Sequence, residues 1–549
     1  MKNKLIVIII IPLFLIFFSC ERKTEKKNRV VIGISSDVET LNPLYTMNIN
    51  EGRISELIYL GLVGHSWDIE EGNIKSYPML AEKLKWSDDR KSLEVKLRND
   101  VKWTDGKKLT SADVVFSFDV YSDPVVQSRF FDMYDNFYLE ENKHINLPKS
   151  FEIISDDSLV IHFSNRHAKL FDIDMPILPK HKFDGINRKD YSTSSLNFEP
   201  VGNGPYKLKS WSRNEKIVLE KNPESFLASD KMIDNLIFKI VPDYNSRIIQ
   251  IKKGNIDLLD DVRPEDLESL RKSENLVTVI TKGRSYDYVG WSNIDQKLWN
   301  EKKIVKPHKL FGNANVRKAL TLAINRKLII DEFLNGSAEI ALGPVSPIFK
   351  KFINKDIAPL EFNPEKAKSI LEKEGWIDRN GNGIIDKNGV EFTFTLFIPG
   401  NNPRRQYTAN IIKENLKDVG IEISIEKQEP NIFFNNMFGK KLESWIAGWV
   451  VPIPIDLKPY WFSDFETYFA NCVGYGNKTV DKFLLELENG VNKEKEVEYY
   501  HKIQELIHQD QPVTFLFWID NITAYAKNMK NISIDPLGTV QRCWEWRLN

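Results

Sequence analysis

Hydrophobic and polar residues follow short periodic patterns along most of the chain, and these patterns predict strands and helices in mixed order. Residues 92–98 alternate with a period of two, with Leu93, Val95 and Leu97 apolar, which is typical of a half-buried strand. Residues 151–163 contain two β-rich runs around four polar residues, which predicts a hairpin. Further strands are predicted at 30–35, 391–398, 421–426 and 513–519.

Helical periodicity is strongest in residues 314–334, where apolar residues recur every three or four positions. One amphipathic helix is predicted there, ending at Asn335-Gly336. Thr110 followed three residues later by Asp113 is a capping-box pattern, which predicts the start of another helix. More helices are predicted at 364–374, 404–418, 478–489 and 493–509. Strands and helices are mixed throughout, so the fold class is α/β or α+β.

The first 19 residues form a separate apolar segment. Lys2 and Lys4 precede an apolar run from Leu5 to Phe18, which is short for a membrane-spanning helix but typical of an export signal. Residues 20–29, which begin with a cysteine, are mostly charged and predict a flexible tether. An uncleaved N-terminal anchor is the alternative; in both cases the body of the protein lies outside the cytoplasm.

Composition and charge exclude several classes of protein. The chain has 549 residues, 42% of them hydrophobic and 28% charged, which excludes disorder, collagen and coiled coil for the whole chain. The net charge of −1 gives no concentration of positive charge for binding nucleic acid. After the cysteine at the end of the apolar segment only Cys472 and Cys543 remain, and they are either one disulfide or two free buried thiols.

Six segments then occur in one order along the chain. They are LNPLYTMNINEGRISELIYLGLV (41–63), MLAEKLKWSDDRKSLEVKLRNDVKWTDGKKLTSADVVFSF (79–118), VGNGPYKLKSW (201–211), KKGNIDLL (252–259), NVRKALTLAINRKLII (315–330) and GWVV (448–451). In this order they resemble the family 5 extracellular solute-binding proteins, the peptide, nickel and sugar receptors of ABC importers. Cys20 at the end of the apolar run resembles a bacterial lipoprotein signal, in which residues 1–19 are removed and a diacylglycerol is attached to the cysteine thiol.

The resemblance implies a fold. It is an α/β, type II periplasmic-binding-protein architecture with two lobes and an extra domain, built from discontinuous segments. Lobe I is expected at 30–67, 195–292 and 522–549, the extra domain at 68–194, and lobe II at 293–521.

The resemblance also implies a function without catalysis or a cofactor. We expect a monomeric, lipid-anchored receptor of the cell envelope, periplasmic or extracytoplasmic, that binds a peptide or peptide-like solute by lobe closure. Its partners would be an ABC permease and its ATPase. The alternatives are a receptor for an oligosaccharide or metal complex, or a secreted enzyme or adhesin on the same scaffold. The chain has no nucleophile elbow, His-Glu-x-x-His or Walker loop, which disfavours the enzyme.

Candidate ligand-binding residues come from the same resemblance. They are Trp449, Gly448, Val450, Asp37, Tyr286, Asn293 and Asp456. Trp449 matches a tryptophan that walls a side-chain site in peptide receptors, although a core tryptophan is the alternative. Asp37 precedes the Leu-x-Pro motif, where peptide receptors often carry an acid; it could equally be a solvated loop residue. Tyr286 and Asn293 are predicted near the hinge.

The anchor for a peptide amino terminus departs from the family pattern. In peptide receptors the Gly-Trp pair is followed, after two residues, by an aspartate that binds the α-ammonium. Here that position is Pro452, which has no charge, and the next acid is Asp456. Either Asp456 takes the role by another loop path, or the ligand has no free α-amino group. We favour the second, because two prolines stiffen the segment, and we expect short unmodified peptides to bind weakly.

One short run has the spacing of a calcium-binding loop. Residues 378–386 (DRNGNGIID) place oxygen-bearing side chains at the first, third, fifth and ninth loop positions, but the twelfth is Gly389 instead of a bidentate glutamate. The candidate ligands are Asp378, Asn380, Asn382 and Asp386. A plain hairpin turn is the favoured interpretation, and no metal is expected.

Overall fold

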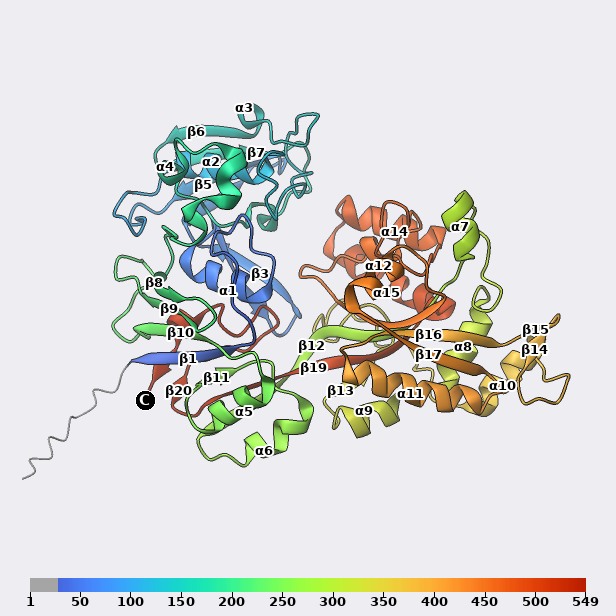
Figure 1. The fold of residues 1–549 in the computed structure, drawn as a ribbon. Helices are drawn as coiled ribbons and strands as arrows, with labels where there is room; N and C mark the ends of the chain where they lie inside the picture. The colour runs from blue at the N-terminus through green and yellow to red at the C-terminus, as the bar shows by residue number, and fades with distance from the viewer. Residues whose placement is uncertain (1–27) are drawn as a thin grey trace, which may run out of the picture.

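The computed structural model describes residues 28–549 (Figure 1). The predicted signal peptide, Cys20 and nearly all of the tether lie outside the described residues. Among residues 28–549, no helix combines the length and apolar character needed to cross a bilayer.

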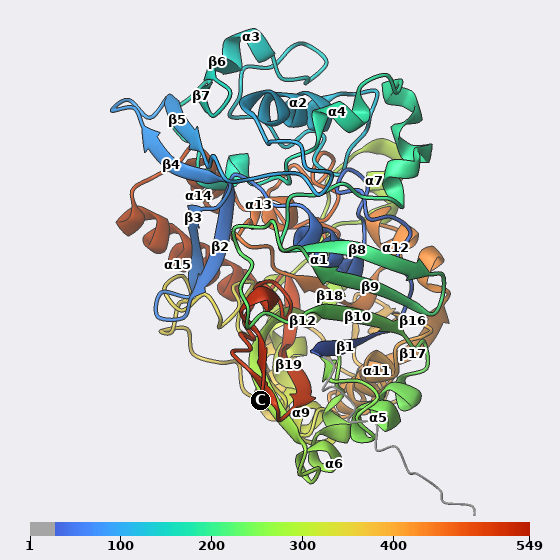
Figure 2. The ribbon, with the colours of Figure 1, turned by 90° about the vertical axis from the view of Figure 1, so that its left-hand side faces the viewer.

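An eleven-stranded mixed sheet runs through the molecule. Its order is β17 (Glu422–Gln428), β16 (Thr393–Pro399), β18 (Ser444–Val450), β12 (Leu276–Trp291), β19 (Val513–Ala526), β11 (Leu258–Leu259), β1 (Arg29–Ile34), β10 (Asn235–Ile240), β9 (Lys216–Lys221) and β8 (Tyr206–Ser212), with β13 (Ala338–Ile340) beside β19. Figure 2 shows β8, β9, β10 and β1 side by side in this order.

The first half of the molecule carries a second, smaller sheet above the main one (Figure 1). Its order is β4 (Ala81–Trp86), β5 (Ser92–Leu97), β7 (Ser158–His162) and β6 (Phe151–Ser155). The other elements of this half are α1 (Ile49–Ile58), β2 (Val63–Asp68), β3 (Asn73–Pro78), α2 (Ser111–Ser122), α3 (Leu147–Ser150), η1 (Leu170–Ile173), α4 (Lys180–Phe183), η2 (Arg188–Thr193), η3 (Ser195–Asn197), α5 (Tyr244–Lys252), η4 (Pro264–Asp266), α6 (Leu267–Arg271), β20 (Met529–Lys530), η5 (Cys543–Glu545) and β21 (Arg547–Leu548).

The second half is mostly helical around the other end of the main sheet (Figure 1). Its elements are α7 (Gln296–Lys302), α8 (Ala314–Ala323), α9 (Arg326–Phe333), α10 (Pro364–Lys373), β14 (Asp386–Lys387), β15 (Val390–Glu391), α11 (Pro403–Lys417), α12 (Pro430–Phe438), α13 (Lys458–Trp461), α14 (Lys478–Glu488) and α15 (Lys493–Asp510). The mixed α/β class predicted from the sequence is therefore confirmed.

Two long antiparallel strands join the halves. β12 and β19 pair from Leu276↔Ala526 to Gly290↔Val513, with a register shift between Thr281 and Ser285. The chain passes into the second half at this shift and returns through the facing part of β19. Residues 286–291 pack in the cores of the second half. The domain limits expected from the sequence stay predictions.

The register shift contains Gly283, and close packing explains the glycine. A Cβ atom there would lie 2.0 Å from the carbonyl oxygen of Ile519 on the paired strand. The neighbouring Arg284 forms two links to the second half: its backbone oxygen accepts from Val451 N at 3.0 Å, and its Nη1 donates to Val451 O at 2.6 Å. The crossing point is thus tied directly to the loop that follows β18.

The β2–β3 hairpin provides another contact between the halves. The Trp67 ring lies 5.8 Å from the Phe349 ring of the second half in an edge-to-face arrangement. At the hairpin tip Lys351 N donates to Glu71 O at 3.1 Å, and the Lys351 ammonium lies 3.5 Å from the Glu71 carboxylate. The halves therefore meet at the crossing strands and along this hairpin.

Most predicted elements form, including the Thr110–Asp113 capping box at the start of α2. The predicted single helix at 314–334 is wrong, because the chain leaves helical geometry at Ile324. The side chain of Asn325 then accepts a hydrogen bond from Leu328 N and caps a second helix. An asparagine that satisfies a free backbone N–H favours a new helix start over continuation of the old helix.

Both described cysteines are free thiols, so the alternative of a disulfide is excluded. Cys472 is buried in the second half, and Cys543 is buried in the first. Burial raises the pKa of the Cys472 thiol to about 12, which makes it unreactive near neutral pH.

A buried ion pair stabilises the start of α11 against β12. Asp287 is 1% exposed, and its carboxylate lies 2.8 Å from Arg404 Nε and 3.0 Å from Arg405 Nη2. Burial alone would raise the pKa of Asp287, but the two guanidinium groups outweigh it and hold that pKa below its usual value. Gly448 is packed against this cluster, because a Cβ there would lie 2.5 Å from Asp287 Oδ1.

Replacing Asp287 by asparagine should lower the free energy of unfolding by about 3–5 kcal/mol, since two partly buried guanidinium groups lose their buried counter-charge. The pKa is lower in the folded protein than the unfolded value of about 3.9, so this stabilisation is present above that pH. It is lost as the pH falls through the folded pKa. Urea unfolding at several pH values measures the difference, with the exposed Asp88→Asn as the control. An equal loss at pH 7 and at strongly acidic pH would contradict the assignment.

Candidate functional site

A large cavity lies in the first half, at its border with the second. Its volume is about 350 Å³. The walls come from the end of α1, the β2–β3 hairpin, residues 129–134 and 171–176 of the predicted extra domain, and the C-terminal segment 537–544. The second half contributes Ile453 from the loop after β18. The cavity is therefore assembled from segments far apart in the chain, and both halves border it.

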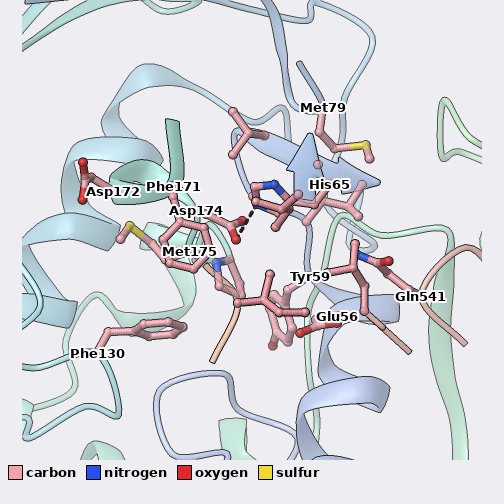
Figure 3. A pocket seen from close by; sticks show the side chains of 18 of the residues that line it. Glu56, Tyr59, His65, Met79, Phe130, Phe171, Asp172, Asp174, Met175 and Gln541 are labelled. Atoms are coloured by element: carbon pink, nitrogen blue, oxygen red, sulfur yellow. Dashed lines mark ion pairs between the residues drawn. The ribbon is translucent and has the colours of Figure 1, made fainter. Parts of the chain in front are cut away.

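Glu56, in the last turn of α1, is one of the carboxylates that line this cavity (Figure 3). Water reaches its carboxylate although protein atoms surround the side chain, as expected of a group that lines a cavity. Burial raises its pKa above the usual value; Arg129 and Arg53 oppose this rise, and Asp174 adds to it. No side chain in residues 28–549 forms a hydrogen bond or ion pair with the Glu56 carboxylate.

A histidine and an aspartate pair on another wall of the cavity, as Figure 3 shows. His65 Nε2 lies 2.6 Å from Asp174 Oδ2, and His65 Nδ1 lies 3.0 Å from Ser76 Oγ. Both ring nitrogens of His65 thus lie next to a polar side chain; the imidazole also opposes the rise in the pKa of Glu56, although it forms no ion pair with that carboxylate.

Besides His65 Nε2, whose contact with Asp174 is an ion pair and not an aligned hydrogen bond, two buried polar atoms in the cavity wall have no hydrogen-bond partner within the described part of the chain. They are the hydroxyl of Tyr134, a residue that is 2% exposed, and the side-chain oxygen of Gln541. A buried polar atom without a partner is costly, and such atoms in a cavity wall indicate a place where a ligand or water supplies the missing bond.

Aromatic rings form much of the remaining wall. The lining includes Tyr59, Tyr77, Phe130, Phe171 and Trp544. The guanidinium of Arg129 lies over the Phe130 ring at 4.3 Å and forms no ion pair among the described residues. Large apolar surfaces with a few polar groups are typical of small-molecule sites.

A second, smaller site lies on the far side of the loop 451–457. Trp449 and Tyr286 line two adjoining cavities of about 10 Å³ each, room for about one water molecule. Trp449 packs edge-to-face on Tyr460 at 4.9 Å and parallel to Tyr288 at 6.4 Å. The protein's own rings thus fill most of this aromatic pocket.

The loop 451–457 separates the two sites. Ile453 faces the large cavity, while Pro452 and Asp456 line the aromatic pocket. Asp456 Oδ1 accepts from Lys458 N at 3.0 Å. Surrounding protein atoms raise the pKa of the Asp456 carboxyl above its usual value, although its side chain remains accessible to water.

The structure brings together most, but not all, of the residues predicted from the sequence. One small cavity is lined by Tyr286, Trp449, Val450 and Asp456. Gly448 comes directly before Trp449 on β18. The other two predicted residues, Asp37 and Asn293, line none of the cavities described here.

Asp37 and Asn293 instead form hydrogen bonds with neighbouring segments of the protein. Asp37 accepts from Trp211 Nε1 at 3.0 Å and from Asn214 N at 2.8 Å. Asn293 Nδ2 donates to the carbonyl oxygens of Trp291 and Pro512 at 2.7 and 3.0 Å. Their ligand-binding role stays a prediction.

The run with calcium-loop spacing forms a compact turn that uses its own oxygens. Asp378 accepts from Gly381 N at 2.7 Å and from Gly383 N at 2.9 Å. Asn380 and Asn382 accept from the backbone of the residues two positions on. Asp386 is paired with Arg379 at 2.9 Å. Within residues 28–549, no group of three or more His, Cys, Asp or Glu side chains is arranged to hold a metal ion.

Sequence reasoning missed the residues of the large cavity. Glu56 falls inside the segment quoted for the family resemblance, but no periodicity separates it from other exposed helix residues. Asp174 and Gln541 fall outside all six segments. Only a three-dimensional structure shows that these three residues share one cavity.

The fold and the cavity at the border of two halves define a two-lobe solute-binding protein of the type II periplasmic class. The chain matches the family described as bacterial extracellular solute-binding proteins, family 5 Middle, over residues 75–468, and it belongs to that family. The family and fold expected from the sequence are thereby confirmed.

Curated relatives and solved structures agree with this membership. The oligopeptide-binding protein AppA of Bacillus subtilis is 29% identical over 533 residues, which cover 96% of this chain and 92% of AppA. The AppA structure in complex with a nonapeptide has a TM-score of 0.72 at 28% identity and covers 95% of this chain and 99% of that one. NikZ from Campylobacter jejuni in complex with Ni(L-His) has a TM-score of 0.74 at 24% identity, with coverage of 95% and 99%.

Replacing Trp449 by alanine should weaken solute binding at least tenfold, or about 1.4 kcal/mol, because the indole is expected to form one wall of the bound solute's site. The solute that co-purifies with the protein is first removed. Its affinity is then measured by titrating it back into the purified protein. Trp376→Ala, a buried tryptophan outside the site, is the matched control for lost core packing. Unchanged affinity in Trp449→Ala would place the solute elsewhere.

Proposed function

We propose that the protein is the solute-binding receptor of an ABC importer and captures a peptide or peptide-like solute by closure of its two lobes. The observation that carries this proposal is the 350 Å³ cavity in the first half to which the second half contributes Ile453. A ligand in such a cavity contacts both lobes and stabilises the closed arrangement, which a permease can then recognise.

The crossing strands suit a hinge for this closure. The register shift at Thr281–Ser285 interrupts regular pairing between β12 and β19, so bending is easiest there. Arg284 connects this point to Val451 at 2.6 Å. Bending at the hinge would therefore move the loop 451–457 toward or away from the large cavity.

The peptide class of the solute is supported by the relatives. AppA, 29% identical along nearly the whole chain, is named as an oligopeptide-binding protein, and its structure holds a nonapeptide. Walls that combine aromatic rings with polar groups can accept varied side chains, as a peptide receptor requires.

We also propose attachment to a membrane through a diacylglycerol on Cys20, with the body of the protein extracytoplasmic. The support is the sequence alone: a positively charged start, an apolar run and a cysteine after Ser19. A lipid anchor would keep the receptor close to its permease and raise the local concentration of captured solute.

Unmodified peptides of two to five residues should bind weakly, because Pro452 replaces the acid that would pair with an α-ammonium, and a buried unpaired ammonium costs several kcal/mol. Isothermal titration with a mixed library, before and after N-acetylation, measures this. Micromolar binding that disappears on N-acetylation and in Asp456→Asn, but not in the exposed Asp88→Asn, would instead assign the anchor to Asp456.

Replacing Cys20 by serine should abolish the incorporation of a labelled fatty acid, since no thiol remains for lipid attachment. Metabolic labelling with a fatty acid provides the measurement, and fractionation of the source bacterium with immunodetection locates the protein. Ser19→Thr is the control. A wild-type protein that stays in the membrane fraction but takes up no fatty acid would favour the uncleaved anchor.

A further inference from the structure

The charges of the large cavity suggest which kind of solute it selects. Its lining contains three carboxylates, on Glu56, Asp172 and Asp174, against the single guanidinium of Arg129 and the imidazole of His65. Such an excess of negative charge in a partly enclosed space lowers the energy of a bound cation and raises that of a bound anion.

Glu56 is the carboxylate without a partner. Arg53, one turn earlier on α1, is paired with Asp260 at 2.7 Å and is therefore not available. Asp174 is paired with His65 at 2.6 Å. Arg129, the remaining cation, stays beyond ion-pair distance from Glu56 and stacks on Phe130 instead. Asp172 accepts a hydrogen bond from Lys169 N. Among the lining carboxylates, Glu56 is thus the one without a hydrogen-bond or ion-pair partner in residues 28–549.

The unsatisfied atoms of Gln541 and Tyr134, like the Glu56 carboxylate, can accept a hydrogen bond from a ligand. The side-chain oxygen of Gln541 can only accept a hydrogen bond, and the Tyr134 hydroxyl can accept one. Glu56, Gln541 and Tyr134 can each accept a hydrogen bond from an N–H donor. Ammonium and guanidinium groups have three and five such donors. The aromatic rings nearby also favour a cation, through their negative faces.

Resting on the proposed receptor function, we propose that the cavity binds a cationic group of the solute, an ammonium or guanidinium, with Glu56 as its counter-charge. The cation could come from a lysine or arginine side chain or from a free amino terminus. The absence of an acid at Pro452 favours the side chain, because the second lobe then has no anchor for an amino terminus at the family position.

The proposal explains why an unpaired acid is kept in this place. The pKa of Glu56 is raised in the unliganded protein, so its ionised form destabilises the folded state as the pH rises through that pKa. Binding a cation removes this cost. Replacing Glu56 by glutamine should therefore leave the protein at least as stable to heat while weakening binding, a combination that a purely structural residue would not give.

The test uses nonapeptides that carry one lysine at each position in turn, N-acetylated, and matched peptides with norleucine instead. The wild type should bind the best lysine peptide at least tenfold more tightly than its norleucine match. Glu56→Gln should remove that preference, Glu56→Asp should keep part of it, and Glu141→Gln, an exposed acid in the same half, should keep all of it. Equal binding of both peptides, or a preference that survives Glu56→Gln, would overturn the proposal.

A third peptide, with norleucine and a free amino terminus, distinguishes the source of the cation. If it binds as tightly as the lysine peptide and loses affinity in Glu56→Gln, the α-ammonium is the bound group. If no nonapeptide binds the wild type, the peptide-receptor function fails, and thermal unfolding with agmatine then tests the cavity itself. Stabilisation of the wild type but not of Glu56→Gln supports the cation site, and an equal response of both proteins overturns it.

Discussion

The pairing of β12 with β19 is the constraint on which the arrangement of the whole molecule depends. These two strands are hydrogen-bonded on both sides of the register shift at Thr281–Ser285, so one continuous sheet spans both halves. Backbone hydrogen bonds fix the two strands side by side, while the irregular segment allows them to bend there. Each lobe can then be rigid internally while the border between them, where the large cavity lies, remains adjustable.

Two acids, the buried Asp287 and the water-accessible Glu56, have opposite surroundings. Asp287 has two arginine partners, and its charge stabilises the packing of α11 on the main sheet. Glu56 lies in a cavity without a partner, and its charge is a cost to the free protein. A folded protein usually compensates buried charges, so a carboxylate left uncompensated at the border of two lobes is most simply understood as a group reserved for a ligand.

The loop 451–457 connects the two parts of the candidate site. Trp449 and Tyr286 form an aromatic pocket on one side, and Ile453 reaches the cavity of the first lobe on the other. Arg284 holds Val451 beside the register shift. If the lobes close by bending there, as we propose, the position of this loop would change with closure. Selectivity can then arise from the first lobe while the second lobe provides the closing surface.

The sequence by itself determined the local elements and the family. Period-two alternation at 92–98, the Thr110–Asp113 capping box and the ordered motifs are short-range signals, and each corresponds to what formed, as β5, α2 and the family match. Only the tertiary structure decided that the helix predicted at 314–334 breaks at Asn325, and that Glu56, Asp174 and Gln541 share a cavity. Their proximity depends on strand pairing and domain packing over hundreds of residues, and no local pattern of hydrophobic and polar positions encodes such distances.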